Sequence, residues 1–268
     1  MTSNDWRRRI DRADELADRY SFAAEILRFY AAIARFQEKF YRDIDNSAVV
    51  AKFSLAPQPF QVPLDREVAG DFPVFLSEVE KTGPAKLRDA ARDIAEGIGD
   101  SHLDLLTRCW EGQVDGSEDD ISDFFARAFL QPFVVSVRTR AQFQWKGPTA
   151  FVCPFCKRKP VVGVLRPLGD GGQRSLICSF CLAEWEFRRI LCPGCGEMDP
   201  AKLPVYAAEE LPHVRVDACD SCKTYLKTVD FTKTALGEPV VDEVASVPLD
   251  LWARQRGYTK LQVNLLQL

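Results

Sequence analysis

Apolar side chains recur every three or four positions between residues 22 and 44, a period that predicts an amphipathic helix. The stripe consists of Phe22, Ile26, Phe29, Tyr30, Ile33, Phe36 and Phe40. Shorter patterns of the same kind predict helices at about 72–82, 84–97 and 101–111. The proline-bearing stretch LAPQPFQVPLD lies between the long stripe and these shorter patterns and predicts a loop.

One more helix is predicted from the segment GSEDDISDFFARAFL. Ser117 stands three residues before Asp120, as in a capping box, and the acidic residues would lie at the positive end of the helix dipole. Residues 1 to about 145 are therefore predicted to be helical throughout.

The pattern changes after Gly147. VVGVLR (161–166), RSLIC (174–178) and EWEFRRIL (184–191) are short and rich in β-branched, aromatic or aliphatic residues. Turn sequences such as Leu-Gly-Asp-Gly-Gly at 168–172 bound them. These segments predict strands, so a strand-rich part follows the helical part.

Length and composition limit the class of protein. A chain of 268 residues with 46% hydrophobic content can form one large or two modest domains with ordinary cores. No apolar run approaches the ~20 residues of a membrane span, so we expect no membrane anchor. Acidic residues follow the early arginines where an export signal would be apolar, so we expect a cytoplasmic protein. Nine cysteines in such a protein favour metal or thiol chemistry over disulfides.

Eight of the nine cysteines form four Cys-x-x-Cys pairs. The spacing is C-x2-C-x21-C-x2-C, then ten residues, then C-x2-C-x23-C-x2-C. Two such pairs on tight turns complete a tetrahedral metal site with metal–sulfur distances of ~2.3 Å. The eight candidate ligands are Cys153, Cys156, Cys178, Cys181, Cys192, Cys195, Cys219 and Cys222.

The order in which the pairs combine depends on the segment between Cys181 and Cys192. If its ten residues are extended, they reach up to ~33 Å, which separates the two flanking pairs. We therefore expect sequential sites, 153/156/178/181 and 192/195/219/222. An interleaved cross-brace and metal-free buried or redox pairs are the alternatives. Four thiolates bind either zinc or a single iron, and the ligands do not distinguish these metals.

No other motif predicts catalysis. We interpret Cys109 as a small buried apolar residue. His102 and His213 do not stand at ligand spacing to a cysteine pair, and the glycines at 171–172 lack the context of a phosphate-binding loop. Acidic pairs such as Glu209 and Glu210 are interpreted as solvated charges. We therefore expect no catalytic residues and no organic cofactor, and we expect that the protein is not an enzyme.

Charge argues against a nucleic-acid partner. The formal net charge is −4 and the pI is near 5.4. Between residues 153 and 181 five basic side chains oppose one acidic side chain, whereas between 192 and 222 two basic side chains oppose six acidic ones. An acidic second module would repel phosphates. This charge pattern favours a protein partner.

The motifs CPFCKRKPVVGVLR, LICSFCLAEWEFRRILCPGC and DACDSCKTYLKTVD, in this order behind a helical region, resemble the formate dehydrogenase accessory protein FdhE family. The later PLDLWARQRGY is also similar to the C-terminal end of that family, and Tyr225 and Lys227 match the family segment after the last pair. The resemblance covers most of the chain and is most specific from 153 to about 230.

The resemblance implies a fold and a function. The fold is α+β and multidomain, with a helical domain (1–147), a first rubredoxin-like or zinc-ribbon module (148–191) and a second such module with a C-terminal extension (192–268). The function is that of a cytoplasmic assembly factor that binds the catalytic subunit of respiratory formate dehydrogenase before export. The eight paired cysteines would bind two metal ions, iron or zinc. The alternatives are a redox-active iron protein that supplies electrons during maturation and a zinc-ribbon protein that binds nucleic acid.

Overall fold

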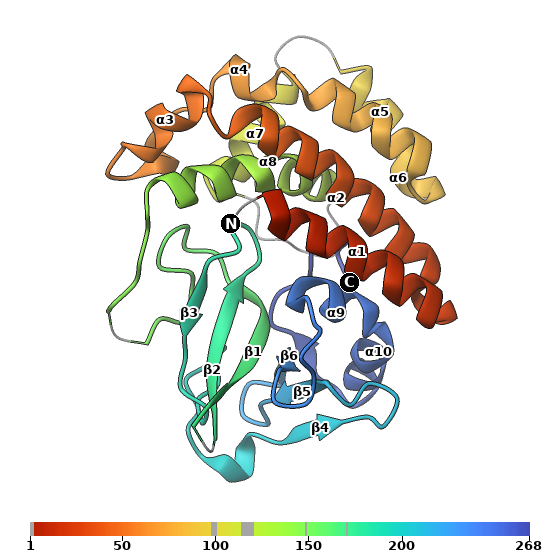
Figure 1. Cartoon of the computed structure of the whole chain (residues 1–268), viewed down its shortest axis with the longest axis vertical. Coiled ribbons are helices and arrows are strands. Elements are labelled where there is room, and N and C mark those ends of the chain that lie inside the picture. Colours follow the sequence, from red (N-terminus) through yellow and green to blue (C-terminus); the bar gives the residue numbers. More distant parts are fainter. Residues whose placement is uncertain (1–2, 98–100, 114–120, 148, 170) are drawn as a thin grey trace. The chain divides into compact units, whose positions relative to one another are not determined.

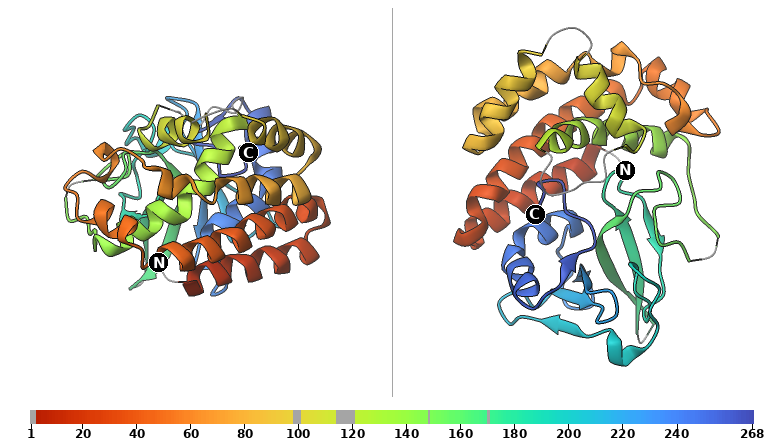
Figure 2. Two further views of the ribbon diagram at one scale, coloured as in Figure 1. Left: turned by 90° about the horizontal axis from the view of Figure 1, so that it is seen from above. Right: turned by 180° about the vertical axis from the view of Figure 1, so that it is seen from behind.

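The computed structural model describes residues 3–97, 101–113, 121–147, 149–169 and 171–268. It forms two compact units, a helical unit that extends to Gln144 and a sheet unit that runs mainly from Trp145 to Asn264. Figure 1 and Figure 2 show the helices of the first unit and the strands of the second. Within the described residues, no helix has both the length and the hydropathy to cross a lipid bilayer.

The helical unit contains the long predicted helix and several shorter ones. The periodic stripe forms α2, preceded by a 3-10 turn at Ser21–Ala23, and the three shorter patterns form α5, α6 and α7, so these predictions are confirmed. The predicted cap at Ser117 and Asp120 lies outside the described residues. The helices are α1 (Ser3–Arg19), α2 (Ala24–Ile44), α3 (Ala48–Ser54), α4 (Arg66–Ala69), α5 (Phe72–Thr82), α6 (Ala85–Ala95), α7 (Ser101–Trp110) and α8 (Ile121–Arg140).

Helix α8 is the centre of this unit. Its residues from Asp123 to Val137 are all buried, and it packs against α2, α3, α5 and α7. Phe129 on α8 lies in a cluster of aromatic rings, with its ring centroid 4.9 Å from that of Phe40 and 5.1 Å from that of Phe72. Burial of such large rings is the main source of stability for a helical core.

The sheet unit is built around one seven-stranded sheet. The predicted strands at 161–166 and 174–178 are confirmed as β1 and β2. The path of paired strands runs β3-β2-β1-β6-β5-β4, and β7 pairs with β6. The strands are β1 (Pro160–Leu168), β2 (Gly171–Cys178), β3 (Glu184–Glu186), β4 (Val205–Ala207), β5 (Val214–Ala218), β6 (Thr224–Asp230) and β7 (Thr259–Lys260).

Parallel pairing of β1 with β6 joins the two cysteine-bearing ribbons into this single sheet. In this strand pair Gly163 lies opposite Thr228. A Cβ atom at position 163 would come within 2.3 Å of the Thr228 hydroxyl oxygen, so a larger residue there would force the Thr228 side chain to shift.

The predicted strand at 184–191 is wrong over most of its length. Regular pairing of β3 with β2 covers Glu184–Glu186, and one further backbone bond joins the amide of Phe187 to the carbonyl of Arg174. Beyond that point the carbonyls of Arg188, Arg189 and Leu191 accept hydrogen bonds from the Arg174 guanidinium instead of from a neighbouring strand. The connector therefore leaves the sheet.

Two short helices lie between β6 and β7, α9 (Pro239–Ala245) and α10 (Val247–Gln255), and the sequence pattern did not predict them. Helix α9 is buried along its whole length and packs against β1 and β6. Lys227 from β6 donates hydrogen bonds to the Asp250 carboxylate on α10 and to the Glu243 carbonyl on α9. The C-terminal helices therefore complete the core of the sheet unit.

Candidate metal centres

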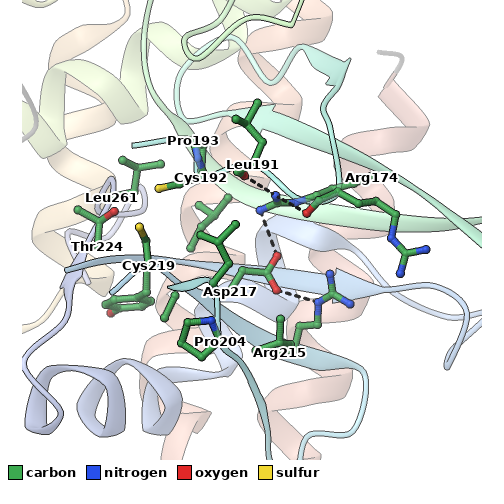
Figure 3. A pocket seen from close by; sticks show the side chains of 16 residues that line it. Arg174, Leu191, Cys192, Pro193, Pro204, Arg215, Asp217, Cys219, Thr224 and Leu261 are labelled. Atoms are coloured by element: carbon green, nitrogen blue, oxygen red, sulfur yellow. Dashed lines mark hydrogen bonds and ion pairs between the residues drawn. The ribbon is translucent and has the colours of Figure 1, made fainter. Parts of the chain in front are cut away.

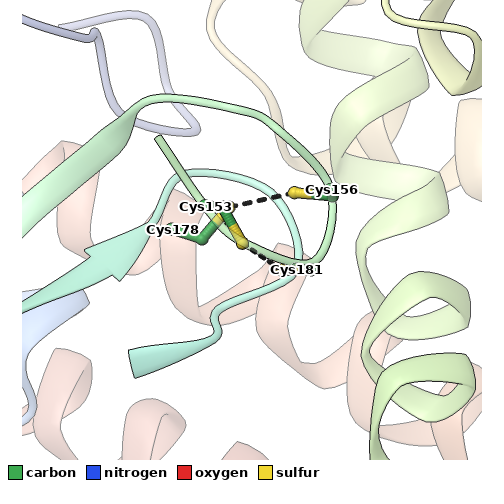
Figure 4. Close-up of side chains that lie close together, drawn as sticks. All are labelled: Cys153, Cys156, Cys178 and Cys181. Carbon is green, nitrogen blue, oxygen red and sulfur yellow. Dashed lines mark hydrogen bonds between the residues drawn. The ribbon is translucent and has the colours of Figure 1, made fainter. Parts of the chain in front are cut away.

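The first four-cysteine cluster is formed by Cys153, Cys156, Cys178 and Cys181, and all four residues are buried. Figure 4 shows their side chains directed toward one another. The sulfur of Cys153 lies 3.4 Å from that of Cys181, and the sulfur of Cys156 lies 3.3 Å from that of Cys178. Strand β2 ends at Cys178 and the hairpin between the pairs brings the second turn back to the first, as the insert length predicts.

The second cluster is formed by Cys192, Cys195, Cys219 and Cys222. The Cys192 and Cys222 sulfurs are 3.7 Å apart, and so are the Cys195 and Cys219 sulfurs. The structure thus brings the pairs together sequentially and not in the interleaved order. This cluster is more open than the first, because Cys195 is exposed and Cys222 is half-buried.

All four Cys-x-x-Cys turns share one backbone geometry. In each turn the amide of the first cysteine donates a hydrogen bond to the carbonyl five residues later, with distances between 2.8 and 2.9 Å. The residue after the second cysteine has a left-handed backbone in every case. These residues are Lys157 (φ 63°), Leu182 (φ 56°), Gly196 (φ 83°) and Lys223 (φ 56°). Non-glycine residues rarely adopt this conformation, so the local fold imposes it at three positions.

Backbone amides also point at the sulfurs. The amide of Phe180 donates to the Cys178 sulfur and the amide of Gly194 donates to the Cys192 sulfur, both at 3.3 Å. Hydrogen bonds of this kind stabilise thiolate rather than thiol. Burial alone would raise the pKa of Cys222, but hydrogen bonds from the Thr224 hydroxyl and amide and from Cys195 and Cys219 lower it to about 7. Burial raises the pKa of Cys192, Cys195 and Cys219, so within the second cluster the thiolate is favoured at Cys222.

The donor sets fit a tetrahedral metal ion. A metal–sulfur distance of ~2.3 Å gives sulfur–sulfur edges of about 3.8 Å in a regular tetrahedron. Within each cluster the sulfurs all lie within 4.8 Å of one another. Each cluster can thus accept one ion with little movement, and two ions per chain are possible. Four sulfur ligands suit both iron and zinc.

A small cavity of about 50 Å³ lies beside the second cluster (Figure 3). Cys192 and Cys219 line it together with three arginines, Arg174, Arg189 and Arg215, and one acidic residue, Asp217. The Arg174 guanidinium lies 3.1 Å from Asp217, and Arg215 lies 2.9 Å from the same carboxylate. The cavity wall is therefore positively charged next to sulfurs that become negative on metal binding.

The other residues that the sequence singled out pack in the core or form hydrogen bonds away from the cysteine clusters. Cys109 is buried in the helical unit. His102 is hydrogen-bonded to the Ile94 carbonyl at 2.8 Å, and His213 lies 2.9 Å from the buried Asp242 carboxylate. Neither histidine belongs to a cysteine cluster. Tyr225 donates to Asp250 at 2.8 Å, and Lys227 belongs to the same buried network.

Sequence reasoning missed Arg174 and Thr224 as neighbours of the second cluster. Arg174 stands four residues before Cys178 of the first cluster, and nothing in its local pattern indicates that it reaches the other ribbon. Thr224 stands two residues after Cys222, and its hydroxyl lies 3.0 Å from that sulfur. A hydroxyl residue just after the last cysteine is a usable signal, whereas the role of Arg174 depends on tertiary structure.

Two family models match adjacent segments of the cysteine-bearing part of the chain. The model described as "FdhE, central domain" matches residues 152–189, and the model described as "FdhE, C-terminal domain" matches residues 190–267. The boundary between the two matches falls in the connector between the clusters.

Individual relatives extend the similarity over the helical part. "Protein FdhE homolog" from Aquifex aeolicus is 26% identical over 271 residues, which cover 96% of this chain and 93% of the relative. "Protein FdhE" from Escherichia coli (strain K12 / DH10B) is 27% identical over 278 residues, covering 97% and 87%. The crystal structure of the FdhE protein from Pseudomonas aeruginosa has a TM-score of 0.72 at 22% identity and covers 99% of this chain and 96% of that one. The last comparison shows a shared fold.

Proposed function

Because this chain belongs to the FdhE family, we propose that it is an accessory factor of formate dehydrogenase that binds the catalytic subunit in the cytoplasm and supports its maturation before export. The observation that carries the proposal is the match to both family domains over the residues that contain all eight clustered cysteines. In this proposal the chain acts by binding a protein partner, not as an enzyme.

Two metal ions, iron or zinc, have a structural role in the proposal. Cys153, Cys156, Cys178 and Cys181 would hold one ion, and Cys192, Cys195, Cys219 and Cys222 would hold the other. A bound ion cross-links the two turns of its cluster, so its binding free energy contributes to the folding free energy of the ribbon. The turns themselves supply thiolates, and their backbone amides stabilise the charge on sulfur.

The proposal also divides the chain into three parts, 1–147, 148–191 and 192–268. The boundary between the two family matches, at residues 189 and 190, supports the division between the second and third parts. The shared sheet adds that the two ribbons are parts of one folding unit, since β1 and β6 pair directly.

A redox role is a second candidate, and the exposure of Cys195 favours it. If the second cluster holds iron, electron exchange with a partner is helped by a ligand at the surface. In this version the chain supplies electrons during maturation of the enzyme.

Recovery of a complex tests the first proposal. An affinity-tagged chain is purified from cells in which export of formate dehydrogenase is blocked, and the bound proteins are identified by mass spectrometry. We expect the pre-export catalytic subunit in the complex, and a Cys178→Ser variant should recover less of it because its first ribbon unfolds. A folded, metal-loaded chain that recovers no catalytic subunit would overturn the proposal.

Metal exchange separates the two candidates. Cells that lack the chain are complemented with the wild type under conditions that load zinc or iron, and formate dehydrogenase activity is measured. If the zinc form restores the activity fully, the redox role is excluded. If only the iron form does so, the metals do more than stabilise the ribbons.

A further inference from the structure

Arg174 lies on β2 of the first ribbon, yet its side chain contacts residues on both sides of the second cluster. The strand places it four residues before Cys178. Its side chain is only 3% exposed, so its charge is almost completely removed from solvent. A buried guanidinium is costly unless it is paired and hydrogen-bonded. The partners of Arg174 are therefore informative.

Two of these partners flank the cysteines of the second cluster. The guanidinium donates to the Leu191 carbonyl at 3.1 Å, and Leu191 is the residue directly before Cys192. It also lies 3.1 Å from the Asp217 carboxylate, and Asp217 is two residues before Cys219. One side chain thus contacts the residues that lead into both turns of the second cluster (Figure 3).

Two further side chains hold the Asp217 carboxylate in place. Arg215 donates to one oxygen of its carboxylate at 2.9 Å, and the Thr228 hydroxyl donates to the other at 2.8 Å. Thr228 is the residue that pairs with Gly163 on β1. The contacts therefore form a continuous path from the first ribbon to the turn that carries Cys219.

The bonds that close the first cluster run within its own ribbon. The Cys153 amide donates to the Arg158 carbonyl, and the Cys178 amide donates to the Ala183 carbonyl. The second cluster has equivalent bonds, but its first turn also depends on Arg174 from the other ribbon. Arg174 therefore couples the first ribbon to the second cluster.

We propose that Arg174 is a positioning residue for the second four-cysteine site, and that it makes metal binding there depend on an intact first ribbon. The inference rests on the metal-ligand role in the proposed function and not on the identity of the partner. Residues that orient metal ligands from outside the coordination shell contribute about 10- to 100-fold to metal affinity.

Geometry, and not charge alone, is required at this position. A guanidinium offers several N–H groups in a planar fork, so it bonds the carbonyl of Leu191 and the carboxylate of Asp217 at the same time. A lysine keeps the positive charge but presents it from a single nitrogen. Arg174→Lys therefore separates positioning from charge compensation of the thiolates. Arg189 lines the same cavity, so Arg189→Met removes a charge of the same sign and is a matched control.

The first experiment is competition titration of the full chain with zinc and a coloured chelator. We expect two tightly bound ions in the wild type and in Arg189→Met. In Arg174→Lys and Arg174→Met the first site keeps its affinity and the second is weakened by about 10- to 100-fold. Alkylation with mass spectrometry identifies the weakened site, since Cys192, Cys195, Cys219 and Cys222 should lose protection. An Arg174→Lys variant with wild-type affinity at both sites would overturn the proposal.

The second experiment tests the dependence of the second site on the first ribbon and does not need an arginine variant. In Cys178→Ser we expect weak binding at both sites, and in Cys195→Ser we expect loss of the second site. Helical circular dichroism shows whether each variant retains the helical unit. Wild-type affinity of the second site in Cys178→Ser would contradict the proposal. A wild-type chain that binds fewer than two ions would overturn the metal assignment itself, independently of any result on partner binding.

Discussion

The ammonium of Lys227 on β6 lies 2.5 Å from the Asp250 carboxylate on α10, and both side chains are almost completely buried. Lys227 also lies 3.0 Å from the Glu243 carboxylate, and Lys260 contacts both acidic residues. Two positive and two negative charges therefore balance within this buried network. Burial lowers the pKa of Lys227, and its acidic neighbours oppose this shift. The network connects β6 and β7 to the C-terminal helices.

Replacement of Lys227 by methionine should destabilise the sheet unit strongly. The change leaves two buried carboxylates with one ammonium, and loss of one partner from a buried ion pair typically costs about 3–5 kcal/mol. The free energy of unfolding, measured in denaturant on the metal-loaded chain, checks this. Lys202→Met is the control, because Lys202 is exposed and lies 3.7 Å from Glu197, and an exposed pair contributes about 0–1 kcal/mol. Equal losses in the two variants would contradict the prediction.

The second cluster should lose its metal before the first. Cys195 is exposed, whereas all four cysteines of the first cluster are buried, so a chelator reaches the second ion more easily. We expect two kinetic phases of zinc release in excess chelator, the faster one from the second site. Cys195→Ser should remove the fast phase and retain the slow one. A single phase in the wild type, with all eight cysteines becoming reactive together, would show that exposure does not control release.

Replacement of Phe129 by alanine should destabilise the helical unit by about 3–5 kcal/mol, the usual cost of removing a buried aromatic ring. Its ring packs against those of Phe40, Phe72 and Phe75. Thermal or denaturant unfolding followed by helical circular dichroism measures the loss. Val74→Ala on α5 is the control because Val74 is 55% exposed, and it should change stability by less than about 0.5 kcal/mol. A small effect of the Phe129 substitution would show that the core closes around the gap.

Tyr41 should make the helical unit sensitive to alkaline pH. Burial, together with the nearby negative charge of Asp45, raises the pKa of Tyr41 from 10.0 to about 12. The folded state thus favours the neutral phenol, so this contribution is complete below pH ~10 and is lost as the pH rises toward 12. Denaturant unfolding at pH 9, 10 and 11 should show a smaller decline in Tyr41→Phe than in the wild type. Parallel declines would exclude Tyr41 as the cause.

The sequence predicts the elements that depend on local periodicity. The apolar stripe of α2 has the helical period over its whole length, and the four cysteine pairs have ribbon-length inserts, so both are visible without a structure. The metal-ligand role of the cysteines and the division into three parts stay predictions. The elements that were missed or misplaced depend on distant contacts. The strand predicted at 184–191 ends early because Arg174 binds the connector carbonyls.

The left-handed residues show a second limit of sequence reasoning. Glycine at 196 is a recognisable signal for such a backbone, but lysine at 157 and 223 and leucine at 182 are not. Their conformation is imposed by the bonds that close each cysteine turn. The α9 and α10 helices are short and their polar buried residues mask an apolar pattern, so periodicity does not indicate them.

The pairing of β1 with β6 has a consequence for synthesis of the chain on the ribosome. Gly163 and Thr228 are partners although they stand 65 positions apart in the sequence, the difference between 228 and 163. The first ribbon is made before β6, so the edge of β1 that later pairs with it is open in the nascent chain. Open strand edges promote wrong pairing with other chains. Early metal capture by the first cluster would hold the hairpin in shape during this interval, until the rest of the sheet leaves the ribosome.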